Sequence, residues 1–321
     1  MNLEDYFVCP KCHSELVRSE YFLCNECSSI FPIVNNIPIF VTGERDSDSI
    51  SEFWDKGWEK RLGKESDQQF LLEYKKEELF SLMENNIHKL INRDHSISDT
   101  IPINDQMMLN IGCGTGEAPL FTVLGAKNYI GIDFSLFAAK MSLKNIEKLG
   151  GSGITAQANA ELLPIKNNSI DLIYSNGVLH HTPETQKAFN EVYRVLKSKG
   201  KAVIGLYNKY SPKFIFERII GETFKYMGGI KYWYQLGESD WQTDGLINPW
   251  TKTYSLYELK KLLLNYEIED VKFRRRSFSF GNLIPIPKIA RYINNKSFGE
   301  NLTRYLQSYL GCMWVISFKK K

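Results

Sequence analysis

A regular alternation of short apolar runs with amphipathic helical patterns, between residues 107 and 207, constrains the fold of this chain most strongly. The apolar runs that predict buried strands stand at 107–111, 128–133, 154–159, 169–177 and 200–207, and the helical patterns stand at 118–126, 135–149 and 185–197. Strands that alternate with helices over short connections form right-handed crossovers. We therefore predict an α/β fold with a doubly wound, mostly parallel sheet and helices on both of its faces.

Four of the six cysteines lie within the first thirty residues, as two Cys-x-x-Cys pairs separated by eleven residues. They are Cys9, Cys12, Cys24 and Cys27. This spacing is close to that of a zinc ribbon, in which two short turns offer four thiolates to one tetrahedral ion. Residues 1–42 are too few to bury a core of their own, so zinc would hold them together. We predict a small β-rich ribbon with structural zinc, because an all-cysteine shell leaves no position for water.

The charge and the hydropathy of the chain argue against some classes of protein. Lys and Arg number 40 and Asp and Glu number 37, and the net charge of +3 predicts no general attraction to nucleic acid or membranes. No run approaches the roughly 18 apolar residues of a membrane helix, and the N-terminus does not resemble a signal peptide. The sequence predicts a cytoplasmic protein without a transmembrane segment, where clustered cysteines favour metal over disulfides.

The stretch between the ribbon and the alternating region has two parts. Residues 42–52 are polar without periodicity and predict a linker, whereas residues 53–91 carry apolar positions at helical spacing. We expect a linker and helical segment at 43–100 and one further domain at 101–321. Trp54 and Trp58 share one helical face, which favours core packing. An aromatic-rich insertion at about 207–254 fits either a lid over an apolar substrate or a helical satellite core.

A glycine-rich turn follows the first predicted strand of the alternating region. In "NIGCGTGE", residues 110–117, the glycines Gly112, Gly114 and Gly116 allow positive φ and close approach of a ligand. Glu117 departs from the dinucleotide fingerprint, and no Lys-Ser or Lys-Thr pair follows as in a phosphate-binding P-loop. Asp133 ends the next strand, where it is placed to accept both hydroxyls of a ribose. The pair of features predicts a nucleoside ligand at the carboxyl edge of the sheet.

Four stretches then show a resemblance to a known family. "MLNIGCGTGE", "YIGIDFS", "AQANAELLPIKNNSIDLIYSNGVLHHTPE" and "FNEVYRVLKSKGKAVIGLY" resemble successive motifs of class I S-adenosylmethionine-dependent methyltransferases of the ubiquinone-biosynthesis-like, type 11 subgroup, over about residues 107–207. The resemblance implies a Rossmann-like fold and S-adenosyl-L-methionine as cofactor. Residues 5–42 likewise resemble the zinc-binding domain of the tRNA methyltransferase activator family, which occurs alone or fused ahead of methyltransferase domains.

The resemblance also implies a set of cofactor-binding residues. The glycines would pack against the methionine part, Asp133 would bind ribose, and the residues near Phe134 and Asn159 would meet adenine. The full set is Asn110, Gly112, Gly114, Gly116, Asp133, Phe134, Ser135, Asn159, Ala160 and Asn176. Asn110 and Asn159 stand where the family usually has Asp, so an acceptor is kept and a charge is lost.

Methyl transfer from a sulfonium is an in-line displacement, so the protein mainly aligns the reacting atoms and excludes water. A base helps only where the nucleophile carries a proton of high pKa. His180 and His181 follow the fourth predicted strand at the carboxyl edge of the sheet, and either one is a candidate base, with His180 slightly preferred. The alternative role of these histidines is to order the backbone at the start of a helix or loop.

Three functions remain open from the sequence. The first is methylation of a small-molecule or lipid-like biosynthetic intermediate, which the subgroup resemblance and the aromatic insertion favour. The second is methylation of rRNA or tRNA, with the zinc ribbon and the basic run Arg274, Arg275 and Arg276 holding RNA. The motif Asn/Asp-Pro-Pro-aromatic, which would support RNA, is replaced by "SNGVLHH". The third is an inactive scaffold, in view of Asn110 and Asn159.

Overall fold

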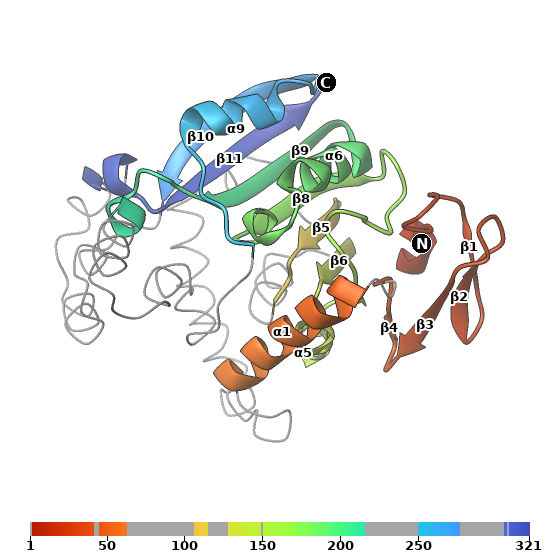
Figure 1. Cartoon of the computed structure of the whole chain (residues 1–321). Coiled ribbons are helices and arrows are strands. Elements are labelled where there is room, and N and C mark those ends of the chain that lie inside the picture. Colours follow the sequence, from red (N-terminus) through yellow and green to blue (C-terminus); the bar gives the residue numbers. More distant parts are fainter. Residues whose placement is uncertain are drawn as a thin grey trace.

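The chain forms two sheets, a large one and a small one, that lie beside each other. The computed structural model describes residues 2–41, 45–62, 106–114, 128–148, 150–215, 250–276, 305–306 and 308–321. Figure 1 shows the small sheet at one end of the molecule and the strands β10 and β11 at another, with helices packed along the large sheet. The described part of the chain thus contains the α/β fold and the small β-rich unit that the sequence predicts.

The large sheet has seven strands in the order β10-β11-β9-β8-β5-β6-β7. Its strands are β5 (Met107–Ile111), β6 (Asn128–Asp133), β7 (Gly153–Gln157), β8 (Ile170–Asn176), β9 (Leu196–Tyr207), β10 (Ile268–Arg276) and β11 (Met313–Lys320). Strands β5 to β9 pair in parallel, and β11 joins β9 and β10 antiparallel. The sheet is therefore mostly parallel and Rossmann-like, as predicted.

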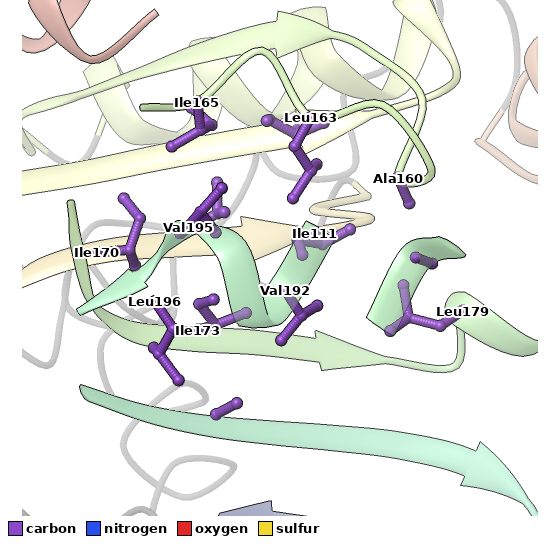
Figure 2. Packing of buried hydrophobic residues seen from close by; sticks show 14 of the residues in the cluster. Ile111, Ala160, Leu163, Ile165, Ile170, Ile173, Leu179, Val192, Val195 and Leu196 are labelled. Carbon is purple, nitrogen blue, oxygen red and sulfur yellow. The ribbon is translucent and has the colours of Figure 1, made fainter. Parts of the chain in front are cut away.

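Successive side chains of a strand point to opposite faces of the sheet, and a hydrophobic core covers each face of the large sheet. On one face, Met108, Tyr129, Leu172 and Val203 form a core with Ile146 of helix α5 (Leu136–Lys148). The other face belongs to a larger core that includes helices α6 (Thr185–Val195) and α9 (Leu256–Leu263). Figure 2 shows Val192 and Val195 of α6 lying beside the sheet residues Ile170 and Ile173 in this core.

The small sheet is an antiparallel meander in the order β1-β2-β3-β4. Its strands are β1 (Leu16–Arg18), β2 (Tyr21–Cys24), β3 (Ile30–Val34) and β4 (Ile37–Pro38), and a short helix η1 (Leu3–Tyr6) precedes them. The hairpin between β3 and β4 turns at Asn35 and Asn36, whose φ angles of 52° and 63° are left-handed. Asparagine tolerates this region, so the pair makes a two-residue hairpin turn within a stretch that otherwise reads as one apolar run.

The small sheet shares its core with the large one. The rings of Phe22 and Phe31 on its strands, and of Phe7 and Phe40 beside them, are buried, and their contacting pairs have centroids 5.0 to 6.0 Å apart. All four belong to the same core as β5, β8 and α6. The residues after β4 run along the free edge of β7, where the Phe40 amide donates to the Gln157 carbonyl at 2.8 Å. The small unit therefore covers an edge strand of the large sheet.

Helix α1 (Arg45–Leu62) departs from the predicted linker. The polar stretch 42–52 predicts a linker, but the helix begins at Arg45 and packs against α5. Ser51 is buried in this contact, which a composition-based reading of the segment does not anticipate. Helices were predicted over residues 53–91, and the part of this stretch after residue 62 lies outside the described residues. The helix predicted at 118–126 and residues 216–249 of the aromatic insertion also lie outside them.

Among the helices that the structure describes, none is both long and apolar enough to span a membrane.

Candidate functional site

The glycine loop after β5 adopts the conformation for which its glycines are required. Gly112 and Gly114 have φ angles of +74° and +52°, in the left-handed region that other residues enter at a cost. The amides of Gly112 and Cys113 donate to the Ile132 carbonyl at 2.6 and 3.0 Å, which ties the loop to β6. A Cβ atom at Gly112 would lie 2.1 Å from Val178 Cγ2, so only glycine fits there. Gly116 lies outside the described residues.

Asp133 at the end of β6 is held rigidly beside this loop. Its Oδ2 accepts from the Gly114 amide and its Oδ1 accepts from the Ser135 amide, each at 2.9 Å. The side chain is 9% exposed, and burial raises the pKa of the carboxyl to about 6. The nearby charge of Asp55 acts in the same direction as burial, while the backbone hydrogen bonds oppose it. The carboxylate therefore has a fixed direction, as a ribose-binding acceptor needs.

The residues after Asp133 start helix α5. The buried Ser135 accepts the Ala138 amide on Oγ at 3.0 Å, which is the hydrogen bond of a helix N-cap. Phe134 is half-buried between these two residues. Asp133, Phe134 and Ser135 thus form one ordered turn, which we call the β6–α5 turn.

The other predicted cofactor residues are spread along the same edge of the sheet. Asn159 is half-buried after β7 and its Oδ1 accepts from the Glu161 amide at 2.9 Å, while the neighbouring Ala160 is buried. Asn176 ends β8 and is exposed. Asn110 is fully buried in β5, and its amide donates to the Tyr129 hydroxyl at 3.1 Å. The structure therefore groups these residues at the carboxyl edge, with Asn110 the most deeply placed.

The two candidate histidines have different surroundings. His180 is fully buried, and its two ring nitrogens have no hydrogen-bond partner among the described residues. Its ring lies against Tyr207 at 3.9 Å between centroids, and burial holds its pKa well below the usual 6.5. His181 is half-buried, with Nδ1 3.2 Å from Thr251 Oγ1. Of the two, His181 is the one whose surroundings keep it accessible.

Helix α1 crosses the site, which the sequence did not reveal. The Trp58 indole would lie 3.3 Å from a Cβ atom at Gly114, so it covers the glycine loop. The Trp54 ring centroid is 5.6 Å from that of His181, at the other end of the site. Asp55, between them, accepts the Phe137 amide at 3.1 Å. The two tryptophans were expected to pack in the core, and the structure shows both half-buried, with their rings against Gly114 and His181. Their spacing of four was the only signal.

The four N-terminal cysteines come together as predicted. All four sulfur atoms lie within 4.8 Å of one another. The Cys9 and Cys27 sulfurs are 3.5 Å apart, and those of Cys12 and Cys24 are 3.4 Å apart. Ligands of a tetrahedral zinc ion at its usual Zn–S distance stand about 3.8 Å from one another. The cluster is therefore of the right size to hold one such ion.

Both Cys-x-x-Cys turns have the same backbone geometry. The Cys9 amide donates to the Ser14 carbonyl and the Cys24 amide to the Ser29 carbonyl, each at 2.9 Å. The residues after the second cysteine of each turn, His13 and Ser28, have φ angles of 59° and 56°. The His13 ring lies outside the sulfur cluster, where burial and the positive charge of Arg194 lower its pKa. It is not a fifth member of the cluster.

Comparisons with known proteins show which proteins this chain is similar to. Residues 109–204 match the family described as "Methyltransferase domain". The uncharacterized protein MJ1252 of Methanocaldococcus jannaschii is 33% identical over 202 residues, which cover 62% of this chain and 73% of that protein. The ubiquinone/menaquinone biosynthesis C-methyltransferase UbiE of Vibrio cholerae is 31% identical over 137 residues, about 40% of this chain and 51% of UbiE.

Among solved structures, YcgJ of Bacillus subtilis aligns with a TM-score of 0.46 at 19% identity, covering 71% of this chain and 97% of YcgJ. The chain thus spans most of MJ1252 but only about half of the UbiE enzyme.

Proposed function

This chain belongs to the same family as protein MJ1252 and is an S-adenosylmethionine-dependent methyltransferase, and we propose that it methylates a small-molecule or lipid-like biosynthetic intermediate. The observation that carries the proposal is the cluster of aromatic rings around His181. The Tyr207 ring centroid lies 5.5 Å from that of His181 and 4.9 Å from that of Phe214, and the Trp54 ring centroid lies 5.6 Å from that of His181. Rings of this kind favour an apolar acceptor over a charged polymer.

The charge of the ribbon supports the same choice against RNA. Residues 2–41 contain five acidic residues and only two basic ones. Zinc held by four thiolates would add a net charge of −2. Such a surface repels a phosphate backbone, whereas RNA-binding modules are basic.

The basic run of β10 does not compensate for the acidic ribbon. Arg274, Arg275 and Arg276 lie on the strand at one edge of the seven-stranded sheet, and the ribbon covers β7 at the opposite edge. Six strand spacings separate the two edges by roughly 30 Å. Arg275 is engaged locally, because it donates to the Tyr309 carbonyl at 2.6 Å and stacks on Trp314. The ribbon and the arginines therefore do not form one RNA-binding surface.

The residues fit the cofactor that the family uses. The left-handed turn at Gly112 and Gly114, together with the fixed carboxylate of Asp133 beside it, suits a nucleoside with an extended amino-acid tail. Gly112, Gly114 and Gly116 would pack against that tail, Asp133 would accept the ribose hydroxyls, and the residues near Phe134 and Asn159 would contact adenine. When bound, S-adenosylmethionine supplies a methyl group on a sulfonium, and the protein's task is to align it and exclude water.

We assign the proposed role of general base to His181 rather than His180. A base must reach the proton that it takes, and His180 has no exposed surface. If the accepting atom carries a proton, replacing His181 by Phe should lower kcat by about 100-fold or more, with little change in cofactor affinity.

The four cysteines are proposed to hold one structural zinc ion. Their number, type and spacing in space suit a closed tetrahedral site. Elemental analysis should therefore find about one zinc per chain.

Calorimetric titration tests the central proposal. Purified protein is titrated with S-adenosylmethionine and S-adenosylhomocysteine, with NAD as the control. Micromolar binding of the first two alone supports the cofactor site and justifies a screen of small-molecule and lipid acceptors against tRNA and rRNA. Absence of binding by either one would favour the inactive scaffold, and methyl incorporation into RNA alone would replace the small-molecule acceptor.

A further inference from the structure

The β6–α5 turn is gripped by two side chains that come from distant parts of the chain. Gln157 reaches it from the end of β7, and Asp55 reaches it from α1. These contacts join residues that are 23 and 82 positions apart in the sequence. Both side chains act on the same few residues that fix the direction of the Asp133 carboxylate.

Gln157 holds the turn by its carbonyl. Its Nε2 donates to the Phe134 carbonyl at 3.0 Å and to Ser51 Oγ at 2.8 Å, and Ser51 Oγ donates to the same carbonyl at 3.3 Å. The residue is 6% exposed, and a buried amide costs free energy unless it is hydrogen-bonded. An apolar side chain would fill this place without that cost. The Gln157 amide instead links α1 and β7 by hydrogen bonds through the Phe134 carbonyl, which an apolar side chain could not do.

Asp55 holds the turn from the other side. Its Oδ1 accepts the Ser135 hydroxyl and also the Phe137 amide, the latter at 3.1 Å. The Phe137 amide belongs to the first turn of α5, where free amides and the helix dipole favour a carboxylate. Asp55 thus caps α5 from a separate helix and, through Ser135, fixes the residue whose amide binds Asp133 Oδ1.

We infer that Gln157 and Asp55 are positioning residues for the cofactor. They hold the backbone of the β6–α5 turn so that the Asp133 carboxylate meets the ribose hydroxyls in one fixed orientation. The inference rests on the proposed function, because it takes Asp133 as the ribose-binding residue. It adds that α1, which carries no family motif, and Gln157 at the end of β7 are parts of the nucleoside site.

Two variants and two matched controls test the inference. Gln157→Leu removes the bridging amide at similar volume, and Asp55→Ala removes the cap. Thr155→Val, on the same strand, removes a buried hydroxyl that donates to the Ala139 carbonyl at 3.0 Å, and Glu52→Gln changes an exposed ion pair on α1. Each protein is titrated with S-adenosylhomocysteine and with 5′-methylthioadenosine, which keeps the nucleoside but lacks the amino-acid tail.

Gln157→Leu and Asp55→Ala should each bind S-adenosylhomocysteine about tenfold more weakly, as expected for one or two lost hydrogen bonds. The same loss should appear with 5′-methylthioadenosine, because the turn serves the ribose. Asp55→Asn, whose side-chain oxygen still accepts an amide, should recover most of the affinity. The control variants should bind as the unaltered protein does.

Unchanged affinity of both Gln157→Leu and Asp55→Ala for the two ligands would overturn the inference. So would an equal loss in Thr155→Val, since general loosening of β7 would then explain the effect. Asp133→Ala separates a failure of the positioning role from a failure of the proposed cofactor site. If Asp133→Ala abolishes binding while the positioning variants keep it, only the inference fails, whereas unchanged binding by Asp133→Ala sinks the proposed cofactor site itself.

Discussion

The cysteine cluster and the nucleoside site solve the same local problem in different ways. Each needs a tight turn with left-handed backbone, and the nucleoside site meets this need with Gly112 and Gly114. The ribbon places His13 and Ser28 in the same region of φ, where a side chain costs roughly 1–2 kcal/mol. Metal–thiolate bonds would offset that cost in the ribbon. The nucleoside loop binds its ligand reversibly, so no permanent bond offsets the backbone strain there, and glycine avoids that strain.

Removal of the metal ligands should give the largest effect. In a Cys9→Ser, Cys24→Ser double variant the ribbon should lose zinc and unfold, because binding of structural zinc contributes on the order of 10 kcal/mol to folding. Hydrogen exchange should show loss of protection in β1 to β3 and also along β7, whose edge the ribbon covers. Cys312→Ser, outside the cluster, is the control. An unchanged exchange pattern in the double variant would contradict a metal-held ribbon.

Gly112→Ala should be the most damaging single change in the nucleoside site. The new Cβ would meet Val178 at 2.1 Å and φ would stay left-handed. We therefore expect the variant to lose roughly 2–4 kcal/mol of stability and also to lose cofactor binding. Gly150 has φ of +70° and open space within 4 Å of the place that its Cβ would take, so Gly150→Ala isolates the cost of backbone strain alone. Equal melting temperatures for Gly112→Ala and Gly150→Ala would refute the steric argument.

The ionised Asp133 carboxyl should lower the stability of the fold and raise its affinity for the cofactor. Its pKa in the folded chain is about 6, above the ordinary value of 3.8. A raised carboxyl pKa stabilises the fold at low pH, and this contribution, roughly 3 kcal/mol, is lost as the pH rises from about 4 through 6. Cofactor affinity should change in the opposite sense, falling as the pH drops below 6. A denaturant titration of the parent chain between about pH 4 and 7 measures this loss of stability.

His180→Phe should be nearly neutral or stabilising by about 1 kcal/mol. The change removes two buried nitrogens that have no partner among the described residues and keeps a ring against Tyr207. His181→Phe serves as the comparison, since it should leave stability unchanged and lower the rate. A thermal melt and a single-turnover assay read the two properties separately. A clear loss of stability in His180→Phe would show that the imidazole stabilises the fold through more than the packing of its ring.

Ser28→Gly should give the smallest effect and the most direct test of the comparison. In zinc-loaded protein, glycine relieves the left-handed strain but loosens the unfolded chain, so stability should change by less than about 1 kcal/mol. After chelation the glycine variant should take up zinc at least as readily as the parent. A large loss of zinc affinity would show that the serine side chain itself supports the site.

The parts of the molecule that sequence predicts well are local. Strands β5 and β6 were predicted at their observed bounds, because each is a short, mostly apolar run that ends at a turn or a helix start. The sulfur cluster was predicted because all four ligands fall within one short segment. Strand β9 begins at Leu196 rather than at the predicted residue 200, since the chain passes from α6 into the strand without a loop.

The missed parts depend on distant pairs. The contact of Gln157 with Ser51 joins positions 106 apart. In the sequence, polar residues such as Ser51 and Asp55 look like ordinary solvent-exposed positions of a helix. Their role becomes visible only once α1 lies on α5. For the same reason the polar composition of 42–52 suggested a linker, whereas tertiary contacts make most of it helix.

The cover that residues 39 and 40 provide along β7 bears on how such a gene can evolve. A shortened gene product that began after the ribbon would expose the amides and carbonyls at the edge of β7, together with the apolar residues of the shared core that had packed against the ribbon. An open edge of this kind pairs readily with other copies of itself. Loss of the first forty codons would thus yield an aggregating protein rather than a smaller enzyme, and selection would keep the two parts in one reading frame.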